Sequence, residues 1–430
     1  MNHVPTSFLV LPSANDRTVA ELQRKVHKVA LRELLTFPAG RLSPRVRQGV
    51  STLRRVLPSA LKASPAAVQH VLSQPEVLTP LLVLALGEGA TEHSPDALLS
   101  ASCPALITGL SHFSRRGAVP EAILWDAPLD HLPDPLGNRV LRFGPAVRGA
   151  LVDPLGLELN AHDEAKVRVQ PGQQPGHASI TVDAAYHPVH PDLPRLRLST
   201  FDNNPLSMFE AHPDKDGNAI SLGDKPLSQW LAMLHEGLEL VRLGLPDWFE
   251  EAKTSMRRLV PVGYLPERHL SATYREAPGV AYLTLCDNPL TLAEALIHET
   301  QHTKINLLSW LDPIVHNAHT CWTTSPVRPD LRPLWGVLLA VHAFVPVAAL
   351  HHRLAELDHP ISRTPDFARR RAEVLAGNHR GMVGVREQSE PSPLGRRLID
   401  EMGDLHDLLR SVAPPPPEGL DLPPDLLPPS

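Results

Sequence analysis

Residues 292–308 read Leu-Ala-Glu-Ala-Leu-Ile-His-Glu-Thr-Gln-His-Thr-Lys-Ile-Asn-Leu-Leu, and the prediction of the fold is built around this stretch. Apolar residues recur in it at three- and four-residue spacing, which is typical of a helix with a buried face. Just upstream, residues 279–285 read Gly-Val-Ala-Tyr-Leu-Thr-Leu and predict a strand. A polar turn at 287–289 separates the two segments. We therefore expect a strand, a short turn and a helix over about 290–311.

The predicted helix contains two histidines four residues apart, His298 and His302, with Glu299 between them. Residues at i and i+4 project from one face of a helix, so both imidazoles can bind one divalent metal ion. Glu299 is the candidate catalytic residue beside that metal. An HExxH pattern also arises by chance, and a chain without a metal is the alternative. The apolar flanks, the uncharged Thr300 and Gln301 and the upstream strand favour the metal site.

A catalytic metal needs a third protein ligand and an open coordination position. Metzincin spacing would place a histidine six residues after His302, where this chain has Leu308. Thermolysin-like spacing would place a glutamate within 318–330, which contains none. We favour His342, the only histidine in the apolar run 335–345, as the third metal ligand, although a core histidine is the competing interpretation. The other candidates are His316, His319, His351, His352 and Glu356.

A proline-rich loop follows, with the sequence Ser325-Pro-Val-Arg-Pro-Asp-Leu-Arg-Pro-Leu334. Its two guanidinium groups, on Arg328 and Arg332, are each able to bind a carboxylate through two parallel hydrogen bonds. Such a group near a metal suits a peptide terminus or a dicarboxylate co-substrate. A surface salt bridge or a helix cap is an equal alternative for either arginine.

The rest of the chain predicts an α+β fold, mostly helical with a small antiparallel or mixed sheet packed on the HExxH helix, as in zincin-like enzymes. Residues 280–285 are the candidate edge strand that could hold an extended peptide, although an ordinary core strand is equally consistent with them. We divide the chain into a mainly helical portion (1–150), a catalytic region (151–412) and a Pro-rich disordered tail (413–430). Helices are expected near 16–36, 44–57, 65–86, 227–243, 246–259, 334–357, 364–377 and 394–411, and strands near 166–169, 179–182 and 195–199.

The composition and charge favour a globular cytoplasmic protein over a nucleic-acid-binding, membrane or disulfide-rich one. The 430 residues are 42% hydrophobic, enough for a sizeable core, and the net charge of −6 gives no general attraction for nucleic acid or an anionic membrane. The three cysteines are too few and too scattered for a disulfide framework, which favours a reducing cytoplasm. The start of the chain lacks the features of a signal peptide, and the apolar run 334–350 is interrupted by His342 and Pro346.

Several motifs follow one another over about residues 195–355: Ala211-His-Pro-Asp214, Ile220-Ser-Leu222 leading to Trp230, Leu259-Val-Pro261, Ser271 with Gly279, the stretch 292–302, and the loop 325–334 with the helix after it. Their order resembles that of the HExxH-motif peptide-modification family of bacterial peptide natural-product clusters. That family is similar to iron- and 2-oxoglutarate-dependent peptide β-hydroxylases. The resemblance implies Fe(II) held by His298 and His302, 2-oxoglutarate held by Arg328 or Arg332, and a precursor peptide as substrate. This chain has Val327 and Leu339 where the family often has an aromatic residue and a histidine.

Three functions therefore compete. The first is Fe(II)/2-oxoglutarate-dependent hydroxylation of a side chain in a ribosomally made peptide, as the resemblance implies. The second is a zinc metallopeptidase with Glu299 as general base. The third is a peptide-binding scaffold that holds no metal. The two arginines of the 325–334 loop and the missing peptidase spacings favour the first.

Overall fold

The computed structural model describes residues 9–13, 16–87, 91–170, 173–209, 217–325, 330–420, 422–423 and 426. Within them the chain is a mixed α+β protein in which helices predominate. Prolines stand in the first turn of most of these helices, where the missing N–H breaks no hydrogen bond. The helices are α1 (Thr18–Thr36), α2 (Pro44–Ala63), α3 (Pro65–Leu72), α4 (Pro75–Ala85), α5 (Pro95–Ser111), α6 (Leu227–Gly244), α7 (Pro246–Ser255), α8 (Pro289–Ser309), α9 (Leu334–Glu356), α10 (Pro365–Gln388) and α11 (Pro393–Ser411).

The described strands form four small sheets. One has the order β1-β4-β5-β6, a second β2-β3-β7, a third β11-β12-β10-β9-β8, and β13 pairs with β14. The strands are β1 (Ile123–Trp125), β2 (Leu129–Asp134), β3 (Arg139–Val147), β4 (Gly149–Asp153), β5 (Gly156–Asn160), β6 (Lys166–Val169), β7 (Ile180–Ala184), β8 (Tyr186–Pro188), β9 (Arg197–Ser199), β10 (Arg258–Tyr264), β11 (Ser271–Ala272), β12 (Val280–Leu285), β13 (Trp322–Thr324) and β14 (Leu331–Pro333).

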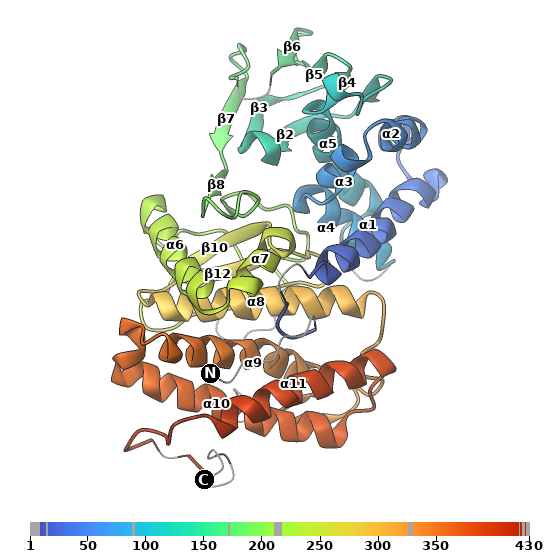
Figure 1. Ribbon diagram of the computed structural model, residues 1–430. Helices are drawn as coiled ribbons and strands as arrows, with labels where there is room; N and C mark the ends of the chain where they lie inside the picture. Colours follow the sequence, from blue (N-terminus) through green and yellow to red (C-terminus); the bar gives the residue numbers. More distant parts are fainter. Residues whose placement is uncertain are drawn as a thin grey trace.

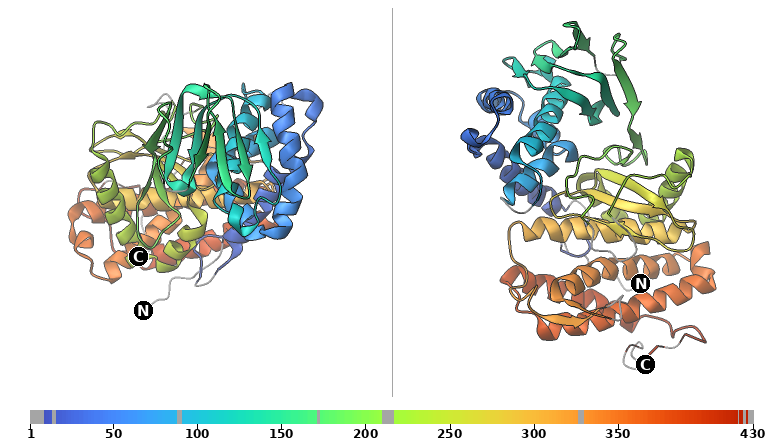
Figure 2. Two further views of the ribbon diagram at one scale, coloured as in Figure 1. Left: turned by 90° about the horizontal axis from the view of Figure 1, so that it is seen from above. Right: turned by 180° about the vertical axis from the view of Figure 1, so that it is seen from behind.

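The predicted strand–turn–helix unit is present and forms the centre of the second half of the chain. β12 leads through a turn into α8, which lies between the five-stranded sheet on one side and α9 with α10 and α11 on the other (Figure 1). The same order of layers is seen from behind (Figure 2). The mixed sheet covers α8 with apolar side chains, so the polar motif of this helix is enclosed by core on two sides.

The expectation that β12 is an edge strand was wrong. β10 pairs with it in parallel on one side, and β11 pairs with it antiparallel on the other. All six of its residues are buried, which explains the continuous apolar sequence. The two-residue strand β11 ends the sheet instead and contacts α8.

Most predicted helices are present near their expected limits, with three informative differences. α2 and α10 continue past their expected ends at 57 and 377, to Ala63 and Gln388. The helix expected over 246–259 ends at Ser255, and β10 begins at Arg258. The segment expected as one helix over 65–86 is two helices, because Pro75 begins a new one. Strands also begin at Ile123, before the boundary predicted at 150.

α9 is the core helix of the lower layer. Its length and composition alone would allow it to cross a membrane, yet 72% of its most apolar window is buried inside the protein, as expected for a helix that packs on α6, α8, α10 and α11. Pro346 lies within it without ending it.

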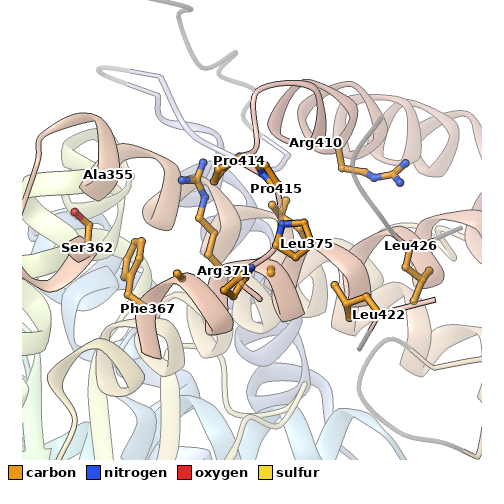
Figure 3. Close-up of a pocket in the computed structure, with 14 residues that line it drawn as sticks. Ala355, Ser362, Phe367, Arg371, Leu375, Arg410, Pro414, Pro415, Leu422 and Leu426 are labelled. Atoms are coloured by element: carbon orange, nitrogen blue, oxygen red, sulfur yellow. The ribbon is translucent and has the colours of Figure 1, made fainter. Parts of the chain in front are cut away.

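The segment after α11 was expected to be disordered, but its described residues pack back onto α10. Pro414 and Pro415 face Phe367, Arg371 and Leu375 across a hollow of about 230 Å3 (Figure 3). Residues 421, 424–425 and 427–430 of the predicted tail lie outside the described residues.

Candidate metal centre

α8 brings the motif residues together one helical turn apart. Asn288 caps the helix by accepting a hydrogen bond from the backbone N–H of Leu290 at 2.9 Å, and Pro289 occupies its first turn. The rings of His298 and His302 lie edge to face with centroids 4.3 Å apart. Together with Glu299 they offer ligand atoms that all lie within 4.8 Å of one another.

Glu299 is held in place by the sheet. Its side chain is 1% exposed, and the hydroxyl of Thr273, just after β11, donates a hydrogen bond to Oε2. The other oxygen, Oε1, lies 4.0 Å from Nε2 of His298. Thr273 therefore fixes the carboxylate beside the two imidazoles and leaves one oxygen directed toward them.

Both imidazoles are kept neutral by their surroundings. Burial, followed by the neighbouring His302 and His269, lowers the pKa of His298 well below its usual value. Burial also lowers the pKa of His302, against the opposing charge of Glu299. A neutral imidazole has the lone pair that a metal needs, whereas a protonated one has none.

Two features of the cluster fit a divalent metal: buried ring nitrogens without a hydrogen-bond partner, and side chains of the types that bind such a metal. Nδ1 of each ring is buried and has no hydrogen-bond partner among the described residues, which is uncommon for a buried polar atom. A metal bound by either ring nitrogen leaves only one nitrogen per ring to be satisfied. Two imidazoles and one carboxylate are donors that Zn(II) and Fe(II) accept, with ligand atoms on such a metal about 3 to 3.5 Å apart.

His342, the favoured third ligand, lies next to the cluster but is not one of the three residues that converge. It is fully buried on α9, and its Nε2 donates to the carbonyl of Leu9 at 2.7 Å. That bond leaves the lone pair on Nδ1, which has no partner among the described residues. Burial lowers its pKa to about 3. Its tautomer suits a metal ligand, and its role as one stays a prediction.

The other candidate ligands are engaged elsewhere. His351 pairs with Glu294 at 2.8 Å, and His352 pairs with Glu356 at 3.4 Å. His316 and His319 are exposed.

Folding adds residues that sequence reasoning did not single out. His269, in the loop before β11, is near enough to His298 to lower its pKa, and Phe344 of α9 packs its ring 4.7 Å from the His298 ring. Arg370 of α10 also lowers the pKa of His298, while both its Nε and Nη2 donate to Glu294. No sequence spacing connects these positions to the motif, because three separate elements deliver them.

The predicted arginine clamp does not converge with the cluster in the described residues. Arg332 on β14 pairs with Asp330 at 3.2 Å and lines a hollow with His319 and Trp335, which shares no lining residue with the histidine cluster. Arg328 lies outside the described residues, as do residues 211–214 of the family resemblance.

A second group of possible ligands, His190, His235 and Glu239, lies between the loop after β8 and α6. The backbone N–H of Asp192 donates to Nδ1 of His190 at 3.1 Å, so the proton of this ring is on Nε2, which lies 2.7 Å from Glu239. A ring with both nitrogens used in this way has no lone pair for a metal. We interpret this group as a hydrogen-bond network that ties the loop to α6.

Comparison with models of known protein families gives no match for this chain, and comparison with curated proteins gives none either. The functional proposal therefore depends on the chemistry of the site.

Proposed function

We propose that the chain is a metal-dependent peptide-modifying enzyme that hydroxylates a side chain of a ribosomally made precursor peptide, with Fe(II) and 2-oxoglutarate, in the cytoplasm. One observation carries the proposal: two neutral imidazoles and a carboxylate offer ligand atoms within 4.8 Å of one another. Two histidines and one carboxylate are the ligand set of non-haem Fe(II) oxygenases.

Each residue of the cluster has a proposed role. His298 and His302 hold the metal, His342 is the proposed third ligand, and Glu299 is an additional ligand or an outer group that orients what binds there. Thr273 holds the carboxylate by its hydroxyl hydrogen bond. Phe344, which packs on His298, restricts water at that side of the ring. Fe(II) bound here would supply oxygen activation with 2-oxoglutarate.

β11 supports an extended peptide as the substrate. It is the terminal strand of the five-stranded sheet and leads directly to Thr273, the partner of Glu299. A peptide added to its outer side by main-chain hydrogen bonds would pass close to the cluster. β11 thus replaces β12 as the proposed edge strand that binds the peptide.

The anchor for 2-oxoglutarate is proposed among three arginines. Arg328 and Arg332 carry the original prediction, and Arg370 is the arginine whose charge reaches His298. Arg370 is already paired with Glu294, so a dicarboxylate there would join an existing ion pair.

A zinc metallopeptidase is the second candidate, and the position of Glu299 favours it. A buried carboxylate with one oxygen fixed by Thr273 and the other directed toward the imidazoles is suited to take a proton from a metal-bound water. The missing metzincin and thermolysin-like ligands weigh against this candidate.

The test is turnover of 2-oxoglutarate by the full chain. Protein reconstituted with Fe(II) should release succinate from 2-oxoglutarate and oxygen, and a peptide substrate should gain one oxygen atom. His298→Ala and His302→Ala should abolish both signals, while His316→Ala, an exposed histidine apart from the cluster, should keep them. Removal of the correct arginine should raise the 2-oxoglutarate requirement about tenfold to a hundredfold.

Peptide cleavage that needs Glu299 and proceeds without oxygen would replace the oxygenase by the zinc hydrolase. Absence of both activities in protein that binds metal stoichiometrically, with candidate precursor peptides supplied, would contradict the proposal.

A further inference from the structure

A second polar hollow lies where α1, α3 and the end of α7 meet, and its lining is basic. It has a volume of about 270 Å3, near the lower end of small-ligand sites. Gln23, Arg24 and His27 of α1 line one side, and His70 of α3 lines another. Arg195 and Arg257 come from the segments before β9 and β10. We call this the α1–α3–α7 hollow; its described lining contains no carboxylate and no residue of the histidine cluster.

Arg257 is the central residue of the hollow because it is buried and has no counter-ion among the described residues. It is 5% exposed, and its guanidinium donates through Nη1 to the carbonyl of Met256 at 3.0 Å. Its Nε is buried and has no hydrogen-bond partner among the described residues. Burial, with Arg195 and Arg258, lowers its pKa to about 9, so the guanidinium remains charged at neutral pH. A buried charge left in this state is costly unless a ligand pairs with it.

The adjacent residue shows how this fold satisfies a structural arginine. Nε and Nη2 of Arg258 donate to Glu76 at 3.0 and 3.2 Å, Nη2 also donates to Gln74, and Nη1 donates to the carbonyl of Arg257. Its guanidinium also stacks over the ring of Tyr186. Arg257, one residue earlier, receives none of these acidic or amide partners.

The histidines of the hollow also include a buried polar atom without a hydrogen-bond partner among the described residues. His27 is 9% exposed, and its buried Nδ1 has no partner among the described residues. Burial and the charge of Arg257 lower the pKa of His27 to about 4. Burial, with Arg195, Arg257 and Arg258, lowers the pKa of His70 to about 4. Both imidazoles are therefore neutral at pH 7, and the arginines carry the positive charge of the hollow.

We propose that the α1–α3–α7 hollow binds a phosphate group, with Arg257 as the buried anchor, Arg195 as the outer anchor, and Gln23, His27 and His70 as further donors. Two guanidinium groups exceed the charge of a single carboxylate and match that of a phosphate dianion. The hollow is open on one side, so the remainder of an esterified ligand would extend outward from the phosphate. This inference is independent of the proposed oxygenase activity.

The experiment is calorimetric titration of the full chain with inorganic phosphate, phenyl phosphate, succinate and chloride at constant ionic strength and pH 7. Phosphate should bind, and Arg257→Gln should weaken it about tenfold to a hundredfold. Arg195→Gln should weaken it in the same direction; because Arg195 is exposed, this variant retains the fold and keeps the test valid if Arg257→Gln does not fold. The matched control is Arg45→Gln, an exposed arginine of α2 outside the hollow, which should bind phosphate as the wild type does.

If phenyl phosphate binds more tightly than inorganic phosphate, the site is assigned to phosphate esters. If inorganic phosphate binds more tightly, the site is assigned to free phosphate. Succinate binding at least as tightly as phosphate would overturn the proposal. So would phosphate binding that Arg195→Gln and a folded Arg257→Gln both retain, or a titration in which phosphate is no different from chloride.

Discussion

Lys304 lies two residues after the metal motif, and its removal should destabilise α8 in a strongly pH-dependent way. Its ammonium pairs with Glu251 of α7 at 2.8 Å, and the two side chains are 1% and 3% exposed. Lys304→Met would leave the Glu251 carboxylate buried without its counter-ion. Loss of one partner of a buried pair typically costs about 3–5 kcal/mol.

The pH dependence follows from the direction of the Glu251 shift. Burial already raises its pKa, and Lys304 is the largest influence that lowers it. Without Lys304 the pKa rises further, so the folded variant binds a proton more tightly than the unfolded chain does. Its stability therefore falls as pH rises above the unfolded value of 4.5. One titrating group changes stability by at most about 1.4 kcal/mol per pH unit, so the variant should be less stable at pH 7.5 than at pH 5.

The assay is urea denaturation of each variant at pH 5 and pH 7.5, with hydrogen exchange of the α8 amides as the local measure. The double variant Lys304→Met with Glu251→Met should recover most of the stability, because two apolar side chains replace the pair. Lys253→Met removes the exposed pair with Glu250 on the same helix and should change stability by less than about 1 kcal/mol. An equal loss for Lys304→Met at both pH values, or a double variant no more stable than the single one, would refute this reasoning.

Three further predictions concern the site and the packing around it. Glu299→Gln should keep the contact with Thr273 and should still bind the metal. If the enzyme is a peptidase, its rate of peptide hydrolysis, measured by product release, should fall about a hundredfold or more. If it is an oxygenase, its turnover, measured as succinate, should fall less. His406 of α11 is fully buried against α10, and burial lowers its pKa to about 3, so the folded protein loses stability as pH falls from 6.5 toward 3. His406→Leu should reduce the slope of the free energy of unfolding against pH by about 1.4 kcal/mol per pH unit, measured by urea titrations at pH 4–6. Gly395→Ala should destabilise by about 1–3 kcal/mol or more because its Cβ would lie 1.8 Å from the carbonyl oxygen of Ile314, whereas Gly336→Ala on α9 meets open space and should gain up to about 1 kcal/mol by thermal denaturation.

The sequence predicted the elements whose own residues determine them. α1, α6, α8 and α9 have strong apolar periodicity or long apolar runs, and their limits are close to the expected ones. β10 was missed because Arg258 and Pro261 interrupt its apolar pattern. In the fold, Glu76 neutralises Arg258 from a position 182 residues away, so the strand tolerates a charge that sequence reasoning treats as exposed.

The residues of the candidate site likewise fall into those that the local sequence predicts and those that only tertiary packing brings together. His298, Glu299 and His302 follow from spacing on one helix, and the structure brings their ligand atoms together. Thr273, His269 and Phe344 reach the cluster through tertiary packing, and no local pattern in the sequence marks them. The contact of His342 with the carbonyl of Leu9 joins residues 333 positions apart, so only the folded chain reveals which of its nitrogens holds the proton.

Metal binding by His298 and His302 is measured by the metal stoichiometry of anaerobically reconstituted protein. We expect one Fe(II) per chain for the wild type and for the His316→Ala control, and none for the double variant His298→Ala with His302→Ala when its fold is intact. Full metal occupancy in that folded double variant would show that these two histidines do not hold the metal.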